Sequence, residues 1–309
     1  MARFLVSRAL QALVSILGVS TIIFVVMHLS GDPTLLLVPE GASREDVELL
    51  RHQLGFDRPL AVQYANYLAG LARGDLGTSL VQRVPVSSIV AARLPYTLLL
   101  AGGALVVALG IGLPVGVITG VWRGTRVEAL LMPVVLVGQS MPTFWSGILL
   151  ILLCAVTWNV LPASGADSWS SLVMPAITLG ALSMATFARL TRTGVVEELG
   201  RDYVRASRAK GVATPAIVLR HVLRNASIPI ITVAALEIAN LLAGAVIVET
   251  VFAWPGLGQL AIQSIAGRDF LVVQALVLLA SFTCVALNLL ADLLYGVVDP
   301  RIMRLAGAR

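Results

Sequence analysis

Long apolar stretches constrain this chain more than any other feature. A helix needs about 20 apolar residues to cross roughly 30 Å of hydrocarbon, and six stretches are long enough: Ala9–Leu29, Tyr96–Val121, Leu130–Trp158, Leu172–Leu190, Ile228–Phe252 and Phe270–Val298. Only 13% of the residues are charged and 58% are hydrophobic, whereas about a quarter of a soluble domain is charged. The sequence therefore predicts an all-α polytopic membrane protein with six transmembrane helices.

The N-terminal apolar stretch is preceded by Arg3 and Arg8. It exceeds the apolar core of a signal peptide, about 7–15 residues, and no small-x-small cleavage pattern follows it. We therefore expect residues 1–30 to be a retained first transmembrane helix.

The distribution of basic residues predicts the orientation, because cytoplasmic loops are enriched in Lys and Arg. With a cytoplasmic N-terminus, the two short outer loops at about 159–171 and 253–269 would carry only Arg268. We therefore expect a multi-pass protein of the cytoplasmic or inner membrane with both termini in the cytoplasm. The net charge of +5 reflects these orientation signals and does not indicate nucleic-acid binding.

Residues 31–95 form the one substantial segment outside the apolar stretches. Apolar residues recur at helical spacing from Val62 to Leu71, which is typical of an amphipathic helix. We expect two or three short helices on the extracytoplasmic face, a segment too small for a separate catalytic domain. Residues 96–309 should then form a five-helix transmembrane core.

Three glycines, Gly112, Gly116 and Gly120, lie four residues apart in the second predicted membrane helix. Small residues at this spacing occupy one helix face and let two backbones approach closely. We therefore predict that this face packs directly against another helix.

Residues 201–226 form a basic loop between two apolar stretches. Asp202 is placed to N-cap a short helix over Tyr203–Lys210, and Gly211 suits the following position, where φ is positive. Thr214 is placed to cap a second short helix that has a proline at its first position. We therefore expect two short helices joined at a glycine.

The first of these helices has two unlike sides. Its arginines fall on one side and small or aromatic residues on the other: Arg201, Arg205 and Arg208 against Tyr203, Ala206 and Ala209. The second helix carries Arg220, His221 and Arg224. Such helices could fit a groove in a partner protein, or could lie on anionic lipid. The residues by themselves leave both interpretations open.

At this point the sequence resembles a known family. The segments Arg205–Gly211 and His221–Ala226, with Pro229 after them, resemble the coupling loop of ABC-importer permeases, in the branch that imports peptides and nickel. Further matching segments are Gly31–Pro33, Leu54–Leu60, Gly74–Ser79, Arg93–Pro95, Glu249–Gly258 and Asp299–Arg301. Arg205 stands where the general family pattern has Glu, as is usual in the peptide branch.

The resemblance implies a type I ABC-importer permease fold and a non-catalytic subunit. With a second homologous permease, the chain would form the path for dipeptides, oligopeptides or related small solutes by alternating access. ATP and Mg would bind to one or two partner ATPases, and an extracytoplasmic solute-binding protein would deliver the cargo. The residues implied in coupling to the ATPases are Arg205, Ala206, Arg208, Ala209, Gly211, His221 and Arg224.

Motifs for other chemistry do not occur in the sequence. It lacks the phosphate-binding Gly-x-x-x-x-Gly-Lys-Ser/Thr pattern, and Lys210 is its only lysine. The three histidines, His28, His52 and His221, are scattered, so we expect no metal site formed by this chain alone. Cys154 and Cys284 lie in apolar runs, where packing is the expected role.

Polar residues inside the apolar stretches are candidates for the translocation path or gate. They are Gln139, Ser140, Thr143 and Ser146 around Pro142, and Glu237 with Asn240. Each could line a water-filled cavity or form a hydrogen bond between helices. For Asn288 and Asp292 in the last stretch we favour the interhelical role.

An irregular turn follows the fifth apolar stretch and contains Trp254, Pro255, Gly256 and Gly258. The resemblance suggests a re-entrant turn at the outer face, near the docking site of the binding protein. The alternative is a plain interfacial turn anchored by its tryptophan.

Two other classes of function are weaker alternatives. A stand-alone secondary transporter would need paired ionisable groups in the membrane and often internal repeats, and neither stands out. A membrane enzyme would need a nucleophile with a base, or a metal cluster. Within the resembled family, nickel or glutathione remains an alternative cargo to peptides.

Overall fold

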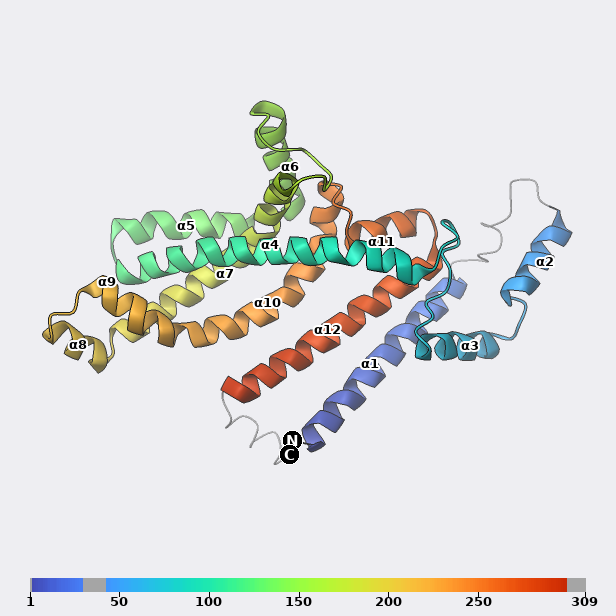
Figure 1. The fold of residues 1–309 in the computed structure, drawn as a ribbon, viewed down its shortest axis with the longest axis horizontal. Helices are drawn as coiled ribbons and strands as arrows, with labels where there is room; N and C mark the ends of the chain where they lie inside the picture. The colour runs from blue at the N-terminus through green and yellow to red at the C-terminus, as the bar shows by residue number, and fades with distance from the viewer. Residues whose placement is uncertain (1, 30–42, 299–309) are drawn as a thin grey trace. The chain divides into compact units, whose positions relative to one another are not determined.

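The computed structural model describes residues 2–29 and 43–298, and their regular elements are helical (Figure 1). A single antiparallel β-bridge joins Thr78 and Pro85. The chain divides into two compact units, residues 1–95 with 260–285 and residues 96–259 with 286–309.

The first unit contains α1 (Ala2–Leu29), α2 (Arg44–Leu54) and α3 (Leu60–Ala72), with parts of α4 (Val86–Val121), α11 (Leu257–Ala266) and α12 (Phe270–Val298). Between Ser43 and the start of α4, the structure shows two short helices, α2 and α3. The turn between α11 and α12 holds the loop before α4, because Asp269 accepts hydrogen bonds from the Ser79 hydroxyl and the Leu80 N–H. Asp269 and Ser79 are both buried, so this contact fixes the loop without exposing a charge.

The second unit is built around α7 (Val173–Leu199), which packs against α5 (Arg126–Ser140) and α10 (Leu223–Val251) (Figure 1). The remaining helical segments are α6 (Thr143–Leu150), a π-helix over Ile151–Thr157, a 3-10 turn over Trp169–Leu172, α8 (Asp202–Ala209), α9 (Thr214–Ile217) and a second π-helix over Val218–Val222. Many side chains of α7 are buried, which accounts for its polar and small residues in an otherwise apolar stretch.

The predicted glycine face does pack closely. A Cβ placed on Gly116 would lie 2.6 Å from the Ala188 carbonyl oxygen of α7, and one on Gly112 would lie 2.7 Å from the Met184 oxygen. From the other side, a Cβ on Gly180 would meet the Ala104 oxygen at 2.6 Å. Glycines on both helices therefore let the backbones of α4 and α7 touch.

Four helices in the described residues are long and apolar enough to cross a membrane: residues 86–121, 169–199, 229–251 and 270–287. A fifth crossing is counted if the bent pair 126–140 and 143–157 forms one span. Within α1 the apolar stretch is shorter, Leu13–Val26. The described residues thus give four or five candidate spans, and the expected six remains a prediction.

The apolar stretch Leu130–Trp158 is not one straight helix, because the chain bends by 106° between α5 and α6, although the two helices together can still form one span. The physical cause is Pro142. A residue before proline avoids the helical region, and Met141 is extended at φ −86 and ψ 135. Proline also lacks the N–H that would continue the helix.

Candidate functional site

The 201–226 loop turns at Gly211, as the sequence predicted. Gly211 has φ +78, and nothing lies within 4 Å of a Cβ built on it. A positive φ favours glycine, so the backbone conformation and not crowding within this chain requires it.

Both predicted caps are displaced by one residue. Arg201 and Ala213 occupy the N-cap positions of α8 and α9, and neither helix has a side-chain cap. Asp202 and Thr214 are instead the first helical residues, where Asp202 still interacts favourably with the helix dipole. The second half of the loop is also not a separate helix, since α9 continues through the π-helix into α10.

Val204 anchors α8 to the second unit. It is fully buried and clusters with Val195 of α7, Ile217 of α9 and Val222. Sequence analysis had assigned the apolar side to Tyr203, Ala206 and Ala209, of which only Tyr203 is partly buried. The anchoring Val204 lies between the arginine side of the helix and the side that carries Tyr203.

The outward surface of the loop is basic and contains small residues. Its exposed members include Arg205, Ala206, Arg208, Ala209, Lys210, Gly211, His221 and Arg224. Arg205 lies 3.8 Å from Asp202, whereas Arg208 and Arg224 have no acidic partner in the described part of the chain. The sequence-predicted coupling residues therefore share one exposed segment, open to a protein groove or an anionic surface.

A hydrogen-bonded network that sequence analysis missed joins this loop to the helices on either side. The Tyr203 hydroxyl of α8 donates to Glu198 Oε2 of α7 at 2.6 Å, and Asn225 Nδ2 of α10 donates to the same oxygen at 3.0 Å. Arg201 lies 3.6 Å from the other carboxylate oxygen. Burial, followed by the hydrogen bond to Glu198, raises the pKa of Tyr203 above its usual value of 10.0. The Glu198 carboxylate therefore connects α7, α8 and α10.

The turn after α10 is organised by Glu249, a fully buried carboxylate. Its Oε2 accepts hydrogen bonds from the N–H groups of Gly258 and Gln259, at 2.7 and 3.0 Å. Its Oε1 accepts from the Thr97 hydroxyl at 2.6 Å. Glu249 therefore caps the start of α11, a role that sequence analysis did not assign to it.

The four predicted turn residues lie around this carboxylate. The Trp254 ring is buried, and its Nε1 donates to the Tyr96 carbonyl at 2.9 Å. A side chain on Gly256 would collide with Glu249, and a Cβ on Gly258 would lie 2.5 Å from the Val246 Cα. Pro255 separates these glycines from the tryptophan. The buried ring indicates a packed turn, in contrast to a tryptophan lying free at the interface.

The polar group around Pro142 flanks the bend between α5 and α6. Gln139 is exposed, and its Oε1 accepts a hydrogen bond from Arg189 at 3.3 Å. Ser140 and Ser146 bond to backbone oxygens of their own segments, and Thr143 is partly buried. The structure thus brings these residues together at a break, and their place in the path stays a prediction.

The other polar residues predicted for the translocation path differ in their contacts and exposure. Glu237 of α10 accepts a hydrogen bond from Ser183 of α7 at 2.7 Å, so it forms the interhelical contact that was its alternative interpretation. Asn240 is exposed. The side chains of Asn288 and Asp292 lie outside the described residues. Among the described side chains, no group of three His, Cys, Asp or Glu residues could hold a metal ion.

Comparison with known proteins identifies the family. A model of the binding-protein-dependent transport system inner membrane component matches residues 112–304, and a model of the N-terminal part of such components matches residues 1–101. The chain belongs to this family. It is therefore a non-catalytic, multi-pass inner-membrane permease of an ABC importer.

Curated relatives resemble the chain along nearly its whole length. The glutathione transport system permease protein GsiC of Escherichia coli (strain K12) is 41% identical over 303 residues, 98% of this chain and 99% of that protein. The GsiC protein of Salmonella typhimurium is 40% identical over the same length.

Solved structures show the same fold at low identity. A structure of inward-facing conformations of the MetNI methionine ABC transporter gives a TM-score of 0.55 at 19% identity, covering 68% of this chain and 96% of that chain. An amino acid ABC transporter with histidines gives 0.51 at 20% identity, covering 67% and 92%. These similarities support the permease fold and say nothing of cargo.

Proposed function

We propose that this chain is one of two permease subunits of an ATP-driven importer whose cargo is glutathione or a related short peptide. The observation that carries the proposal is the 41% identity to a glutathione permease across 98% of the chain. This favours glutathione over the wider peptide range that the coupling-loop resemblance by itself suggested.

In this proposal the chain crosses the membrane six times with both termini in the cytoplasm. An extracytoplasmic binding protein delivers cargo to the outer face, and one or two ATPases bind ATP and Mg below. Their closure moves the 201–226 loop. The exposed arginines Arg205, Arg208 and Arg224 pair with the ATPase. The small residues Ala206 and Gly211 let the loop fit into a groove on the ATPase surface.

The loop is suited to transmit such a movement. Val204 is buried against the second unit, and Glu198 joins α7, α8 and α10 through hydrogen bonds. A force on α8 would therefore reach two membrane helices at once. In this proposal the bend at Pro142 and the polar residues beside it lie on the path.

Cargo is tested by uptake. The chain is produced with its partner subunits in a bacterial strain that lacks its own glutathione importers, and accumulation of radiolabelled glutathione is measured. Saturable uptake that unlabelled glutathione suppresses and nickel does not supports the proposal. Nickel accumulation without glutathione uptake would overturn the cargo assignment.

Partner coupling is tested by co-purification in mild detergent. Gly211→Asp adds a charged side chain to the exposed loop, and it should release the ATPases while leaving the chain in the membrane. Gly74→Asp is the matched control, because Gly74 also has a positive φ and open space around it but lies in the outer segment. ATPase retention by Gly211→Asp equal to that of the control would reject the coupling role.

A further inference from the structure

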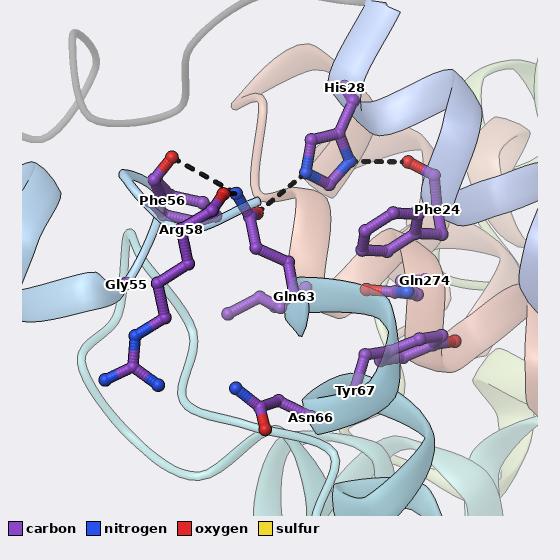
Figure 2. A pocket seen from close by; sticks show the side chains of 10 residues that line it. Phe24, His28, Gly55, Phe56, Arg58, Gln63, Asn66, Tyr67 and Gln274 are labelled. Carbon is purple, nitrogen blue, oxygen red and sulfur yellow. Dashed lines mark hydrogen bonds between the residues drawn. The ribbon is translucent and has the colours of Figure 1, made fainter. Parts of the chain in front are cut away.

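A cavity of 340 Å³ lies within the first unit, and neither the transport proposal nor the sequence motifs assign it a role (Figure 2). It is lined by parts of α1, the α2–α3 linker, α3 and the start of α12, including Phe24, His28, Arg58, Gln63, Tyr67 and Gln274. Its volume is within the range of small-ligand sites, about 300–1,000 Å³.

Two polar atoms of the lining, Gln274 Nε2 and the Tyr67 hydroxyl oxygen, make no well-formed hydrogen bond in the described part of the chain, although the Gln274 side chain lies close enough to Tyr67 to oppose part of the rise in its pKa. The Gln274 side chain is only 4% exposed. Buried polar groups are nearly always satisfied, and leaving one unpaired costs about 1–3 kcal/mol. These two groups on one wall are therefore available to a ligand that offers oxygen atoms.

The polar groups at the edge of the cavity favour an anion. The exposed Arg58 side chain has no acidic partner among the described residues, and none of the lining residues is acidic. His28 faces two acceptors, the Phe24 carbonyl at 2.8 Å and Gln63 Oε1 at 2.9 Å.

Gln63 holds that arrangement in place. Its Nε2 donates to the Phe56 and Arg58 carbonyls at 3.1 and 2.8 Å, which directs its Oε1 toward His28 (Figure 2). These hydrogen bonds, to backbone and side-chain atoms, fix the linker that carries Arg58 at the edge of the cavity.

The cavity is lined by the ends of two largely apolar helices. Phe24 and His28 belong to the last turns of α1, and Leu271 and Gln274 to the first turns of α12, both largely apolar helices. Apolar side chains of α1 beside and before these residues, including Leu17, Ile22 and Val25, are exposed. A ligand here would have its polar part in the cavity and an apolar part along α1.

We propose that this cavity binds the headgroup of an anionic phospholipid from the outer leaflet. The phosphate lies against the Arg58 guanidinium, and the glycerol or headgroup oxygens bond to Gln274 and Tyr67. The acyl chains follow the exposed apolar side of α1. This proposal is independent of the cargo, because it concerns the outer unit and not the path.

The test is native mass spectrometry of the assembled transporter, delipidated in detergent and then titrated with phosphatidylglycerol or phosphatidylcholine. Arg58→Gln removes the charge at an exposed position, and it should weaken phosphatidylglycerol binding about fivefold, as expected for one arginine near a lipid phosphate. Gln274→Leu, close in size, should weaken it further. Arg73→Gln is the matched control, since Arg73 is exposed in the same segment but does not line the cavity.

Each outcome bears on the proposal. Preferential binding of phosphatidylglycerol, lost in Arg58→Gln and kept in Arg73→Gln, supports it. Equal binding of the two lipids, or undiminished phosphatidylglycerol binding in Arg58→Gln, overturns it. Displacement of the lipid by free glycerol phosphate or by a dipeptide at matched concentrations would assign the cavity to a soluble anion instead. Melting temperatures of the variants exclude unfolding as the cause of any loss.

Discussion

The carboxylate of Glu249 accepts a hydrogen bond from the N–H of Gly258, nine residues further along the chain, at 2.7 Å. Thr97 strengthens the arrangement, because its hydroxyl donates to Glu249 and accepts from the Leu257 N–H at 2.8 Å. A charged side chain in an apolar stretch thereby becomes the cap of the following helix. The turn after α10 is built around one buried carboxylate.

Glu249→Gln should destabilise the protein. The amide keeps one acceptor oxygen, so it cannot satisfy both the Thr97 hydroxyl and the two backbone N–H groups of α11. Leaving buried donors unpaired costs about 1–3 kcal/mol each, which should appear as a lower melting temperature in detergent. Thr250→Val is the control, because Thr250 is exposed and its hydroxyl donates to the Val246 carbonyl within α10. Equal melting temperatures of the two variants would contradict the capping role.

Gly116→Ala should weaken the contact between α4 and α7. The added methyl group would lie 2.6 Å from the Ala188 carbonyl oxygen, and such overpacking costs about 1–3 kcal/mol. Gly110→Ala, on the same helix, is the matched control because nothing lies within 4 Å of its Cβ. Thermal unfolding of both variants in detergent checks this. Because alanine favours a helix more than glycine does, Gly110→Ala should not destabilise the protein, and a loss of stability as large as in Gly116→Ala would contradict the packing explanation.

Local chemistry explains what could be predicted from the sequence. The glycine face of α4 and the positive φ of Gly211 follow from the repeat of small residues and from the position after a helix, and both are found. The bend at Met141 could also have been predicted, since the residue before a proline avoids the helical region. The apolar run across it suggested one long helix, and hydropathy does not register backbone geometry.

The interactions that sequence analysis missed depend on residues brought together by tertiary packing. Glu198 and Asn225 are 27 residues apart and meet only because α7 and α10 pack side by side. The contact of Glu249 with Thr97 spans 152 residues. A glutamate within an apolar stretch was a signal for Glu249, but its partners could not be identified without the fold.

Tyr203→Phe should uncouple ATP hydrolysis from transport. The substitution keeps the ring in place and removes the hydroxyl that donates to Glu198 at 2.6 Å, so the link between α7 and α8 weakens while Val204 still anchors the helix. In proteoliposomes containing the proposed complex, cargo transported per ATP should fall several-fold with ATPase binding intact. Ser207→Ala is the control on the same helix, since the Ser207 hydroxyl donates to the Tyr203 carbonyl of its own helix and not to Glu198. An unchanged ratio in Tyr203→Phe would exclude a role for the network in coupling.

Tyr67→Phe should remove one alkaline transition of the outer segment. Burial raises the pKa of Tyr67 from 10.0 to about 12. The folded state therefore holds this proton more tightly, so the stability it contributes is present below pH 10.0 and is lost as the pH rises toward 12. Ultraviolet absorbance of the phenolate during an alkaline titration should show a late step that Tyr67→Phe lacks. Tyr64→Phe, on the same helix, should keep that late step. If the step disappears in Tyr64→Phe and not in Tyr67→Phe, the raised pKa belongs to Tyr64 and the prediction is wrong.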